Sequence, residues 1–252
     1  MKIALIGYGK MGHAIERQAL MRGHEVTVRI DADNISDFDS PAFREADVAI
    51  EFTMPKVAVD NYRRCLERGV KLVSGTTGWT AAMPEIAKLV EESGGTFMWA
   101  SNYSIGVNIF AAVNRYLATL ISRFPQYTPS MKEIHHIHKL DHPSGTAITL
   151  AEGIIDRDRA ITGWTEDAAT TDSSTMLIEH EREGEVPGTH IINWSSDVDD
   201  ITITHTAHSR DGFALGAVMA AEWAADRKGM LTMDMFMRSM LSDPRLLDII
   251  QS

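Results

Sequence analysis

The densest group of chemically active side chains lies at residues 133–147, where the sequence reads EIHHIHKLDHPSGTA. Four of the ten histidines of the chain fall within eight positions there, and Lys139 stands among them. Imidazole is well matched to proton transfer near neutral pH, and an ammonium group attracts anions. The segment therefore indicates an acid–base site for an anionic ligand, with His135, His136 and Lys139 as candidates.

Two other interpretations of the histidine cluster stay open. A histidine can be a packed side chain with a structural role only, and imidazole is also a common zinc ligand. No thiol lies nearby, however, and the positive charge of Lys139 would repel a cation. We therefore expect no metal. If the segment is extended, alternation puts His135 and Lys139 on one face and His136 and His138 on the other.

The turn after this cluster has the features of an anion site. Ser144 is a favourable N-cap for a helix over residues 146–157. The glycine at Gly145 permits close approach, so the N–H groups of Gly145 and Thr146 can hold a carboxylate at the helix N-terminus. With Lys139 close by, we expect an anion pocket; the alternative is a capped helix without a ligand.

A second motif, GYGKMG at residues 7–12, follows a predicted strand and opens a predicted helix. In this context the glycines allow a tight turn, close approach to a pyrophosphate and packing of helix on strand. Asp31 ends the next strand, 19 residues after Gly12, where a carboxylate binds ribose hydroxyls and repels a 2′-phosphate. We expect a dinucleotide, not merely a structural turn. NADH is favoured because no arginine follows Asp31, although Lys10 leaves NADPH open. The candidates are Gly7, Tyr8, Gly9, Lys10, Met11, Gly12 and Asp31.

Two further loops lie where a nicotinamide is expected. The sequence GTTG at residues 75–78 and the sequence ASNYS at residues 100–104 each follow a predicted strand and offer hydroxyl, amide and backbone groups. Taken alone, each is as often an ordinary turn. Arg210 could bind a carboxylate or form a surface ion pair. The loop candidates are Gly75, Thr76, Thr77, Ala100, Ser101, Asn102 and Tyr103.

The elements that must position these residues divide into two sets. In the first hundred residues, strands at 2–6, 26–30, 48–52, 70–74 and 96–100 alternate with helical patterns. This alternation predicts a parallel sheet with helices on both faces, which binds ligands at the carboxyl ends of its strands.

The rhythm changes after Ser104. A long helix at 105–122, a strand at 131–138 and β-like runs at 175–181, 189–195 and 201–207 predict a second, α+β domain. Helices at 213–227 and 233–241 are expected to return to the first domain. We therefore predict an α/β protein with residues 1–104 and 210–252 in a Rossmann-like cofactor domain and residues 105–209 in a second domain.

Composition limits the classes of partner. The chain has 252 residues with 24 basic and 35 acidic side chains, a net charge of −11, which argues against nucleic acid and anionic membranes. Residues 152–200 alone hold 13 acids and three arginines, so donors to an anion must lie elsewhere. The single cysteine and the lack of an apolar segment of about 18 residues lead us to expect a cytoplasmic protein.

Together the motifs resemble the dihydrodipicolinate reductase family. The sequence H-H-x-H-K followed by D-x-P-S-G-T-A is highly specific, and the loops at 7–12, 52–55, 75–78 and 102–104 occur in the same order. The resemblance implies NAD(P)H-dependent reduction of a cyclic dicarboxylate in the diaminopimelate–lysine pathway. It also implies a Rossmann-like cofactor domain and an α+β domain that binds substrate and builds a homotetramer through its sheet.

By motif position, His135 matches the proposed proton donor and Lys139 a second catalytic residue, both acting when the two domains close. The chain departs from the family in a shortened glycine loop and in Met54, where NADPH-using members often have a basic residue. Alternatives are another Rossmann oxidoreductase, such as an aspartate or homoserine dehydrogenase, or a catalytically silent NAD-sensing or metal-binding module. The matched dicarboxylate site comprises His136, Lys139, Ser144, Gly145 and Thr146.

Overall fold

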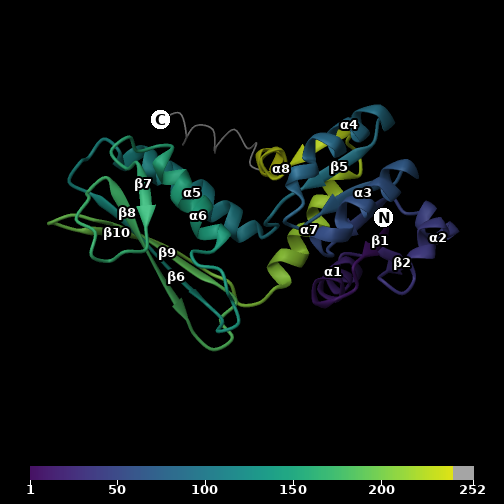
Figure 1. The fold of residues 1–252 in the computed structure, drawn as a ribbon, viewed down its shortest axis with the longest axis horizontal. Coiled ribbons are helices and arrows are strands. Elements are labelled where there is room, and N and C mark those ends of the chain that lie inside the picture. The colour runs from purple at the N-terminus through teal and green to yellow at the C-terminus, as the bar shows by residue number, and fades with distance from the viewer. Residues whose placement is uncertain (241–252) are drawn as a thin grey trace. The chain divides into compact units, whose positions relative to one another are not determined.

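The structure, a computed structural model, describes residues 1–240 (Figure 1). The described residues divide into two compact units: a first unit of Met1–Ser104 with residues 211–240, and a second unit of Ile105–Arg210. Arg210 thus belongs to the second unit. Residues 241–252, which the sequence assigned to the first domain and in part to its last helix, lie outside the described residues.

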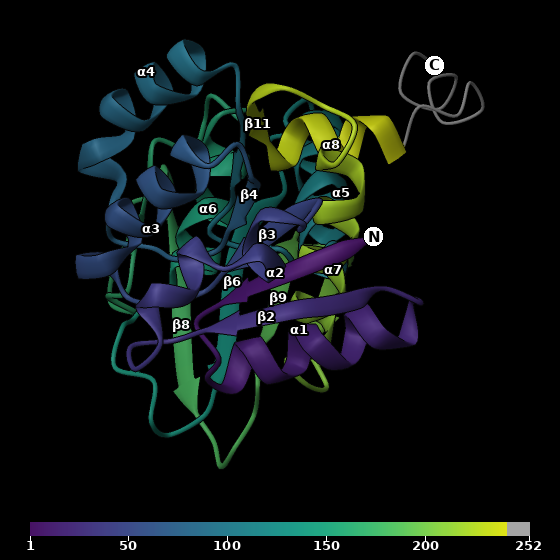
Figure 2. The same ribbon diagram turned by 90° about the vertical axis from the view of Figure 1, so that its right-hand side faces the viewer.

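A six-stranded sheet forms the centre of the first unit, and every strand pair in it is parallel (Figures 1 and 2). The strand order is β11-β5-β4-β3-β1-β2. This confirms the predicted Rossmann-like sheet. The strands are β1 (Lys2–Ile6), β2 (Glu25–Ile30), β3 (Val48–Glu51), β4 (Lys71–Ser74), β5 (Thr96–Trp99) and β11 (Gly229–Thr232).

Two of the helices around this sheet, α7 and α8, come from the last part of the described chain. Both guanidinium contacts from Arg22, directly after α1, to Glu222 on α7 are 2.7 Å long. The four-residue β11 was not predicted, because so short a run has too few positions to show a period. The helices are α1 (Lys10–Met21), α2 (Pro41–Arg44), α3 (Pro55–Glu67), α4 (Met83–Ser93), α7 (Asp211–Ala224) and α8 (Met233–Met240), with 3-10 turns η1 (Ile35–Asp39) and η2 (Thr80–Ala82).

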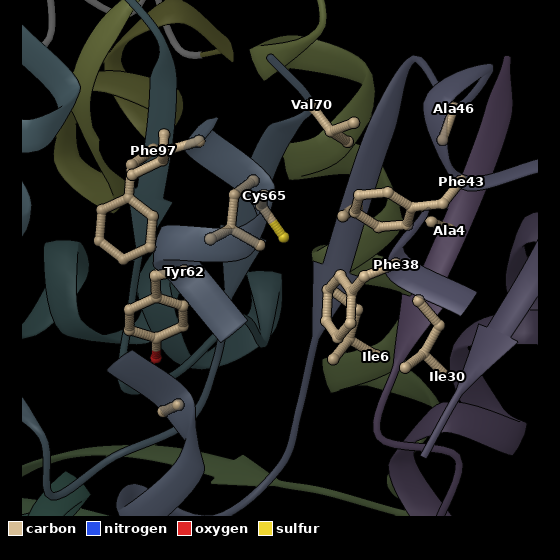
Figure 3. Packing of buried hydrophobic residues seen from close by; sticks show 14 of the residues in the cluster. Ala4, Ile6, Ile30, Phe38, Phe43, Ala46, Tyr62, Cys65, Val70 and Phe97 are labelled. Atoms are coloured by element: carbon tan, nitrogen blue, oxygen red, sulfur yellow. The ribbon is translucent and has the colours of Figure 1, made fainter. Parts of the chain in front are cut away.

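One core of buried residues packs α2, α3 and α4 against this sheet (Figure 3). The rings of Phe38 and Phe43 meet edge to face, 5.0 Å apart, beside the strands, and Tyr62 meets Phe97 at 5.0 Å on the side of α3. Cys65 is fully buried in the same core, and burial raises the pKa of its thiol. The single cysteine is therefore a structural residue of this core.

The second unit contains a five-stranded mixed sheet of order β10-β9-β6-β8-β7. Strand β6 pairs parallel with β8 and antiparallel with β9. Helices α5 and α6 contribute to one core with this sheet, around Phe110, Leu150 and Trp194. The elements are α5 (Ile105–Ile121), β6 (Thr128–His135), α6 (Gly145–Ile155), β7 (Gly163–Thr165), β8 (Thr175–Arg182), β9 (Thr189–Ser195) and β10 (Asp200–Thr206).

The boundaries of β6 correct one prediction. The strand was expected at 131–138 but spans Thr128–His135. Its ladder ends where its partners end, since His135 is the last residue paired with β8, and the chain then turns. The Lys139 N–H donates to the His136 carbonyl within that turn. The extended arrangement with His136 and His138 on one face of a strand is therefore wrong. In the described part of the chain, no helix is long and apolar enough to cross a bilayer.

Candidate active site

The predicted cofactor residues of the first unit gather at one edge of its sheet. The glycine loop follows β1 and Asp31 follows β2, while the loops at 75–78 and 100–104 follow β4 and β5. Because all these strands are parallel, their carboxyl ends lie at the same edge, the usual ligand-binding edge of such sheets.

The space around each glycine of the loop shows whether the fold itself requires glycine there or whether the position is open to a ligand. Gly7 has a φ of +88°, and a Cβ there would lie 2.1 Å from the Phe52 carbonyl oxygen. A Cβ at Gly12 would lie 2.4 Å from the Gly7 carbonyl oxygen. At Gly9, the N-cap of α1, a Cβ would meet nothing within 4 Å. The fold alone thus requires Gly7 and Gly12, whereas Gly9 leaves open space at a helix N-terminus, which fits an approaching pyrophosphate.

Asp31 is exposed and fixed to the glycine loop. Its two carboxylate oxygens accept the N–H groups of Tyr8 at 2.9 Å and Ala32 at 2.8 Å, which leaves lone pairs for ribose hydroxyls. The Tyr8 hydroxyl donates to Glu16, which also pairs with Arg29. The guanidinium two residues before Asp31 is therefore already engaged. Lys10 is exposed and Met11 partly buried.

A buried carboxyl group below this edge was not recognised from the sequence. Glu51 is fully buried at the end of β3 and accepts hydrogen bonds from Ser74 at 2.6 Å, from Thr76 at 3.0 Å and from Thr53. Burial raises the pKa of Glu51, although these hydrogen bonds oppose it. The Thr76 hydroxyl also accepts the Thr53 N–H at 2.8 Å, so it supports the loop from inside.

The remaining candidates at this edge differ in accessibility. Thr77 and Ser101 are exposed, and Asn102 accepts the Ser104 N–H at 2.8 Å. Ala100 and Tyr103 are buried, and the Tyr103 hydroxyl donates to the Ser74 carbonyl at 2.9 Å. The Tyr103 ring therefore packs in the core. Gly75 is required by packing, since a Cβ there would lie 2.1 Å from the Phe52 ring.

In the second unit, a buried carboxylate brings together residues from several elements. Glu133 is fully buried, and its Oε1 accepts the Ser144 N–H at 3.0 Å. Its Oε2 lies 3.5 Å from His135 Nδ1 and 3.7 Å from His190 Nε2. Arg182 Nη2 lies 3.6 Å from Oε1. This set is named the Glu133 cluster below.

Strand register explains the Glu133 cluster. Glu133 and His135 are two residues apart in β6, so their side chains lie on the same face of the strand. His190 pairs with Glu133 across the antiparallel ladder with β9, and Arg182 pairs with His135 across the parallel ladder with β8. Sequence reasoning missed Glu133, His190 and Arg182. Only Glu133 carried a local signal, its position two residues before His135.

Electrostatics keep the imidazoles of this cluster neutral. Burial lowers the pKa of His135, the Glu133 charge opposes this, and Lys139 and Arg182 lower it further. Burial and nearby positive charges lower the pKa of His190 to about 3. Among the described residues, His135 Nδ1 and Glu133 Oε2 are buried without a hydrogen-bond partner. A proton on His135 would draw these two atoms together.

Lys139 lies in the turn after β6. Its ammonium is 2.8 Å from both carboxylate oxygens of Asp141. Burial opposes ionisation of Asp141, but the hydrogen bond and the charge of Lys139, a backbone hydrogen bond and the nearby His135 together lower the pKa of Asp141. Arg182 donates to the carbonyls of Lys139 at 3.2 Å and Asp141 at 2.7 Å, so β8 holds the backbone of the turn.

Helix α6 has the predicted N-cap but spans Gly145–Ile155, where residues 146–157 were predicted. Ser144 is its N-cap and accepts the Ala147 N–H at 3.1 Å. Gly145 is exposed, and a Cβ there would meet nothing within 4 Å. Thr146 follows as the second helical residue. The start of α6 is therefore open to an anion, within reach of the Glu133 cluster through Ser144.

Two further candidates of the second unit line one cavity. His136 and Arg210 line one cavity together with Glu185 and Pro187. His136 and Arg210 are thus neighbours, although they are 74 positions apart in sequence. Both can face an anion in that cavity.

Two family models match successive parts of the chain. The model described as dihydrodipicolinate reductase, N-terminus, matches residues 1–103, and the model for the C-terminus matches residues 106–237. The chain belongs to the dihydrodipicolinate reductase family. It is accordingly an NAD(P)H-dependent oxidoreductase with 4-hydroxy-tetrahydrodipicolinate reductase activity in lysine biosynthesis. The alternatives of another Rossmann oxidoreductase and of a catalytically silent module are set aside.

Full-length relatives agree with this assignment. A 4-hydroxy-tetrahydrodipicolinate reductase from Christiangramia forsetii is 44% identical, covering 96% of this chain and 98% of the relative. The enzyme of that name from Archaeoglobus fulgidus is 33% identical over 94% and 100% of the two chains. Among solved structures, a dipicolinate-bound dihydrodipicolinate reductase from Paenisporosarcina sp. TG-14 superposes with a TM-score of 0.73 at 22% identity, covering 92% of this chain and 97% of that chain.

Proposed function

We propose that this reductase converts the cyclic dicarboxylate 4-hydroxy-tetrahydrodipicolinate to tetrahydrodipicolinate, with His135 as proton donor and Lys139 as second catalytic residue. The observation that carries the proposal is the Glu133 cluster, in which one buried carboxylate approaches His135 and accepts the Ser144 N–H. The Glu133 carboxylate thereby holds the proposed proton donor, His135, close to the start of α6, where an anion can bind. The ligand bound in the related Paenisporosarcina structure, dipicolinate, is a cyclic dicarboxylate too.

Substrate binding uses the turn and the helix start. We assign the two carboxylates of the substrate to Lys139, His136 and the N-terminus of α6 at Ser144, Gly145 and Thr146. An ammonium and helix amides are favourable partners for carboxylates. Arg210, which lines the cavity of His136, is a further donor of the same kind. Lys139 must exchange its contact with Asp141 for the substrate.

The chemistry needs a leaving group, a hydride and a proton. Lys139 assists departure of the C4 hydroxyl, which leaves as water with a proton from the neighbouring ring carbon, so that a double bond conjugated with the imine forms. NAD(P)H, when bound, supplies the hydride that adds to C4 of the conjugated ring. His135 then protonates the resulting enamine at carbon, which completes the addition of two hydrogens across the double bond. A histidine is well matched to such a transfer near neutral pH.

The low pKa of His135 couples proton uptake to substrate binding. Burial leaves the imidazole neutral in the free protein. Two carboxylates arriving beside it favour its protonated form, because an opposite charge raises the pKa of a base. Glu133 then gains a charged partner at Nδ1. The proton donor is thus loaded in the complex, when it is needed.

We assign the cofactor to the first unit and favour NADH over NADPH. The exposed carboxylate of Asp31 suits ribose hydroxyls and repels a 2′-phosphate, and Arg29 is engaged by Glu16. The residues assigned to the cofactor are Gly7, Tyr8, Gly9, Lys10, Met11, Gly12, Asp31, Gly75, Thr76, Thr77, Ala100, Ser101, Asn102 and Tyr103.

We assign substrate binding and homotetramer formation to the second unit, through its sheet. Helices cover one face of that sheet, and Ile134 and Ile191 on alternate positions remain only half-buried. Apolar side chains left partly exposed on a sheet favour association with another copy. Since a reductase of lysine biosynthesis consumes NAD(P)H, we place the protein in the cytoplasm.

A coupled assay tests this function. The condensation product of pyruvate and aspartate semialdehyde is supplied as substrate, and oxidation of NADH or NADPH is followed by absorbance. We expect turnover with both cofactors and a higher kcat/KM with NADH. An absence of turnover overturns the proposal, whereas a preference for NADPH overturns only the cofactor assignment.

The variant Asp31→Ala sharpens the cofactor test. We expect it to raise the KM for NADH and to narrow the preference between the two cofactors, because the ribose partner and the repulsion of phosphate are both lost. The exposed neighbour Asp33, replaced by alanine, serves as the matched control and should leave the ratio unchanged.

A further inference from the structure

A second histidine cluster lies outside the residues assigned to the reaction. His142 Nδ1 is 3.0 Å and His180 Nδ1 is 2.9 Å from the same atom, Oε1 of Glu166. The two imidazole rings stack with centroids 4.4 Å apart and an angle of 17°. The side chains keep 52%, 35% and 29% of their surface exposed for His142, His180 and Glu166. Three potential metal ligands thus converge on one accessible point.

Three separate segments build this cluster. His142 lies in the loop between β6 and α6, Glu166 directly follows β7, and His180 is in β8. The parallel pairing of β7 with β8 brings the last two segments together. His180 pairs with Glu133 across the ladder between β8 and β6, which brings it towards the loop that follows β6. The convergence follows from the fold and not from a local sequence motif.

The geometry suits a divalent ion. The candidate ligand atoms of the cluster all lie within 4.8 Å of one another. In a tetrahedral zinc site, bonds of about 2.0–2.1 Å separate neighbouring ligand atoms by about 3.3 Å. The nitrogen–oxygen distances of 2.9 and 3.0 Å need to widen by only a few tenths of an ångström. The exposed side leaves room for a water molecule as the fourth ligand.

The electrostatic surroundings favour a cation here. Glu166 and His180 belong to the segment 152–200, which holds 13 acids and three arginines. The Glu133 cluster also offers three potential ligands, but it is buried, with Arg182 Nη2 3.6 Å from the carboxylate and the charge of Lys139 acting on His135. Positive charges around a buried site oppose a metal ion, so the exposed cluster is the better site of the two.

We propose that His142 Nδ1, His180 Nδ1 and the Glu166 carboxylate bind one divalent ion of the zinc class, with water as the fourth ligand. The ion would link the loop that carries Lys139 to the sheet edge formed by β7 and β8. This changes the prediction from sequence that the histidine cluster holds no metal. The proposal does not depend on the assignment of catalytic residues.

Cobalt titration tests the site without using activity. The untagged full-length protein is freed of metal with a chelator and titrated with Co²⁺, whose visible absorption reports tetrahedral coordination. We expect one Co²⁺ per chain, displacement by one Zn²⁺, and a rise in the unfolding midpoint with added Zn²⁺. His180 and His142 come from different segments, and replacement of either by alanine should weaken Co²⁺ binding by about 100-fold or more. Loss of a residue that only supports a metal ligand typically weakens metal binding by about 10- to 100-fold.

A matched control is available in the same unit. His138 Nε2 lies 3.0 Å from Glu185 as an exposed histidine–glutamate pair, and it belongs to neither three-residue cluster. His138→Ala should leave Co²⁺ binding unchanged, and circular dichroism establishes that all variants are folded. For a variant that fails to fold, Glu166→Gln, which retains the shape of the side chain, provides the same comparison.

Three outcomes would overturn the proposal. They are the absence of stoichiometric Co²⁺ binding to the wild-type protein, wild-type affinity in folded His142 and His180 variants, and loss of binding on replacement of His190 instead. The last result would move the ion to the Glu133 cluster.

Discussion

Glu51 and Glu133 are two fully buried carboxyl groups that support opposite kinds of site. Hydroxyl groups of Ser74, Thr53 and Thr76 surround Glu51 beneath the cofactor edge of the first unit. Glu133 in the second unit faces groups that carry or can acquire positive charge. The hydroxyl donors around Glu51 are neutral, so burial has the largest effect and raises the pKa of Glu51. The partners of Glu133 include imidazoles, so the charges of the second site change when a histidine takes up a proton.

The comparison teaches that burial alone does not define a catalytic carboxylate. Around Glu51, each polar neighbour is neutral and fixes the path of a loop. Around Glu133, the neighbours include an imidazole that changes charge in the proposed reaction. Four variants test this difference, in order of decreasing expected effect.

The largest effect is expected for His135→Gln. Loss of the proton donor should lower kcat by about 10²–10⁴-fold, the usual contribution of general acid catalysis, with a much smaller change in KM. Steady-state kinetics measure both. Replacement of the exposed His208 by glutamine is the control and should leave kcat unchanged. Wild-type turnover in His135→Gln would refute the assignment of the proton donor.

The next effect concerns acid stability through His190. Burial lowers its pKa in the folded protein to about 3, so the unfolded chain binds a proton more readily. The stability from this group is complete above the unfolded pKa of about 6.5 and is lost as the pH falls towards 3, by up to about 1.4 kcal/mol per pH unit. His190→Gln should flatten this slope in urea unfolding series. An unchanged slope would contradict the buried neutral imidazole.

A smaller effect is expected for Glu133→Gln. The amide keeps the volume of the side chain but removes the charge facing Arg182 and His135, which should lower the free energy of unfolding by about 1–3 kcal/mol. It should also lower kcat, because the protonated His135 loses its partner. Urea unfolding and steady-state kinetics report the two changes. A loss of stability with unchanged kcat would make Glu133 purely structural.

The smallest effect is expected for Glu51→Gln. Because burial raises the folded pKa of Glu51, its contribution to stability is complete below the unfolded pKa of about 4.3 and decreases as the pH rises through the folded value. The glutamine amide does not ionise, so the variant does not lose this stability as the pH rises. We expect a change within about 1 kcal/mol at neutral pH. The free energy of unfolding of the variant should therefore increase relative to that of the wild type as the pH rises. A large loss at neutral pH would show that the charge itself is required.

The sequence predicted local features well. Alternating strand and helix patterns predicted the parallel sheet, and Ser144 with Gly145 predicted the start of α6, because both depend on near neighbours in the chain. The Glu133 cluster was only half predicted. Its second histidine, His190, lies opposite Glu133 through the register of β6 and β9, which joins residues 57 positions apart.

Other errors have the same physical origin. The end of β6 depends on where its partner strands end, so alternation beyond His135 misled the interpretation of His136 and His138. Glu51 lies in the strand predicted at 48–52 and carries no local signal of its role, since the hydroxyls that accommodate it come from β4 and the neighbouring loops. Pairing partners distant in sequence, and not local propensity, decided these cases.

Arg182 holds the turn after β6 through carbonyl oxygens of Lys139 and Asp141 and not through their side chains. Every amino acid has a backbone carbonyl oxygen, so these hydrogen bonds from Arg182 do not depend on which residues occupy the turn. Between them, Leu140 is 91% exposed and packs against almost nothing. The turn can therefore change its outward-facing side chains during evolution, or accept a probe attached at residue 140, while its backbone keeps the same course.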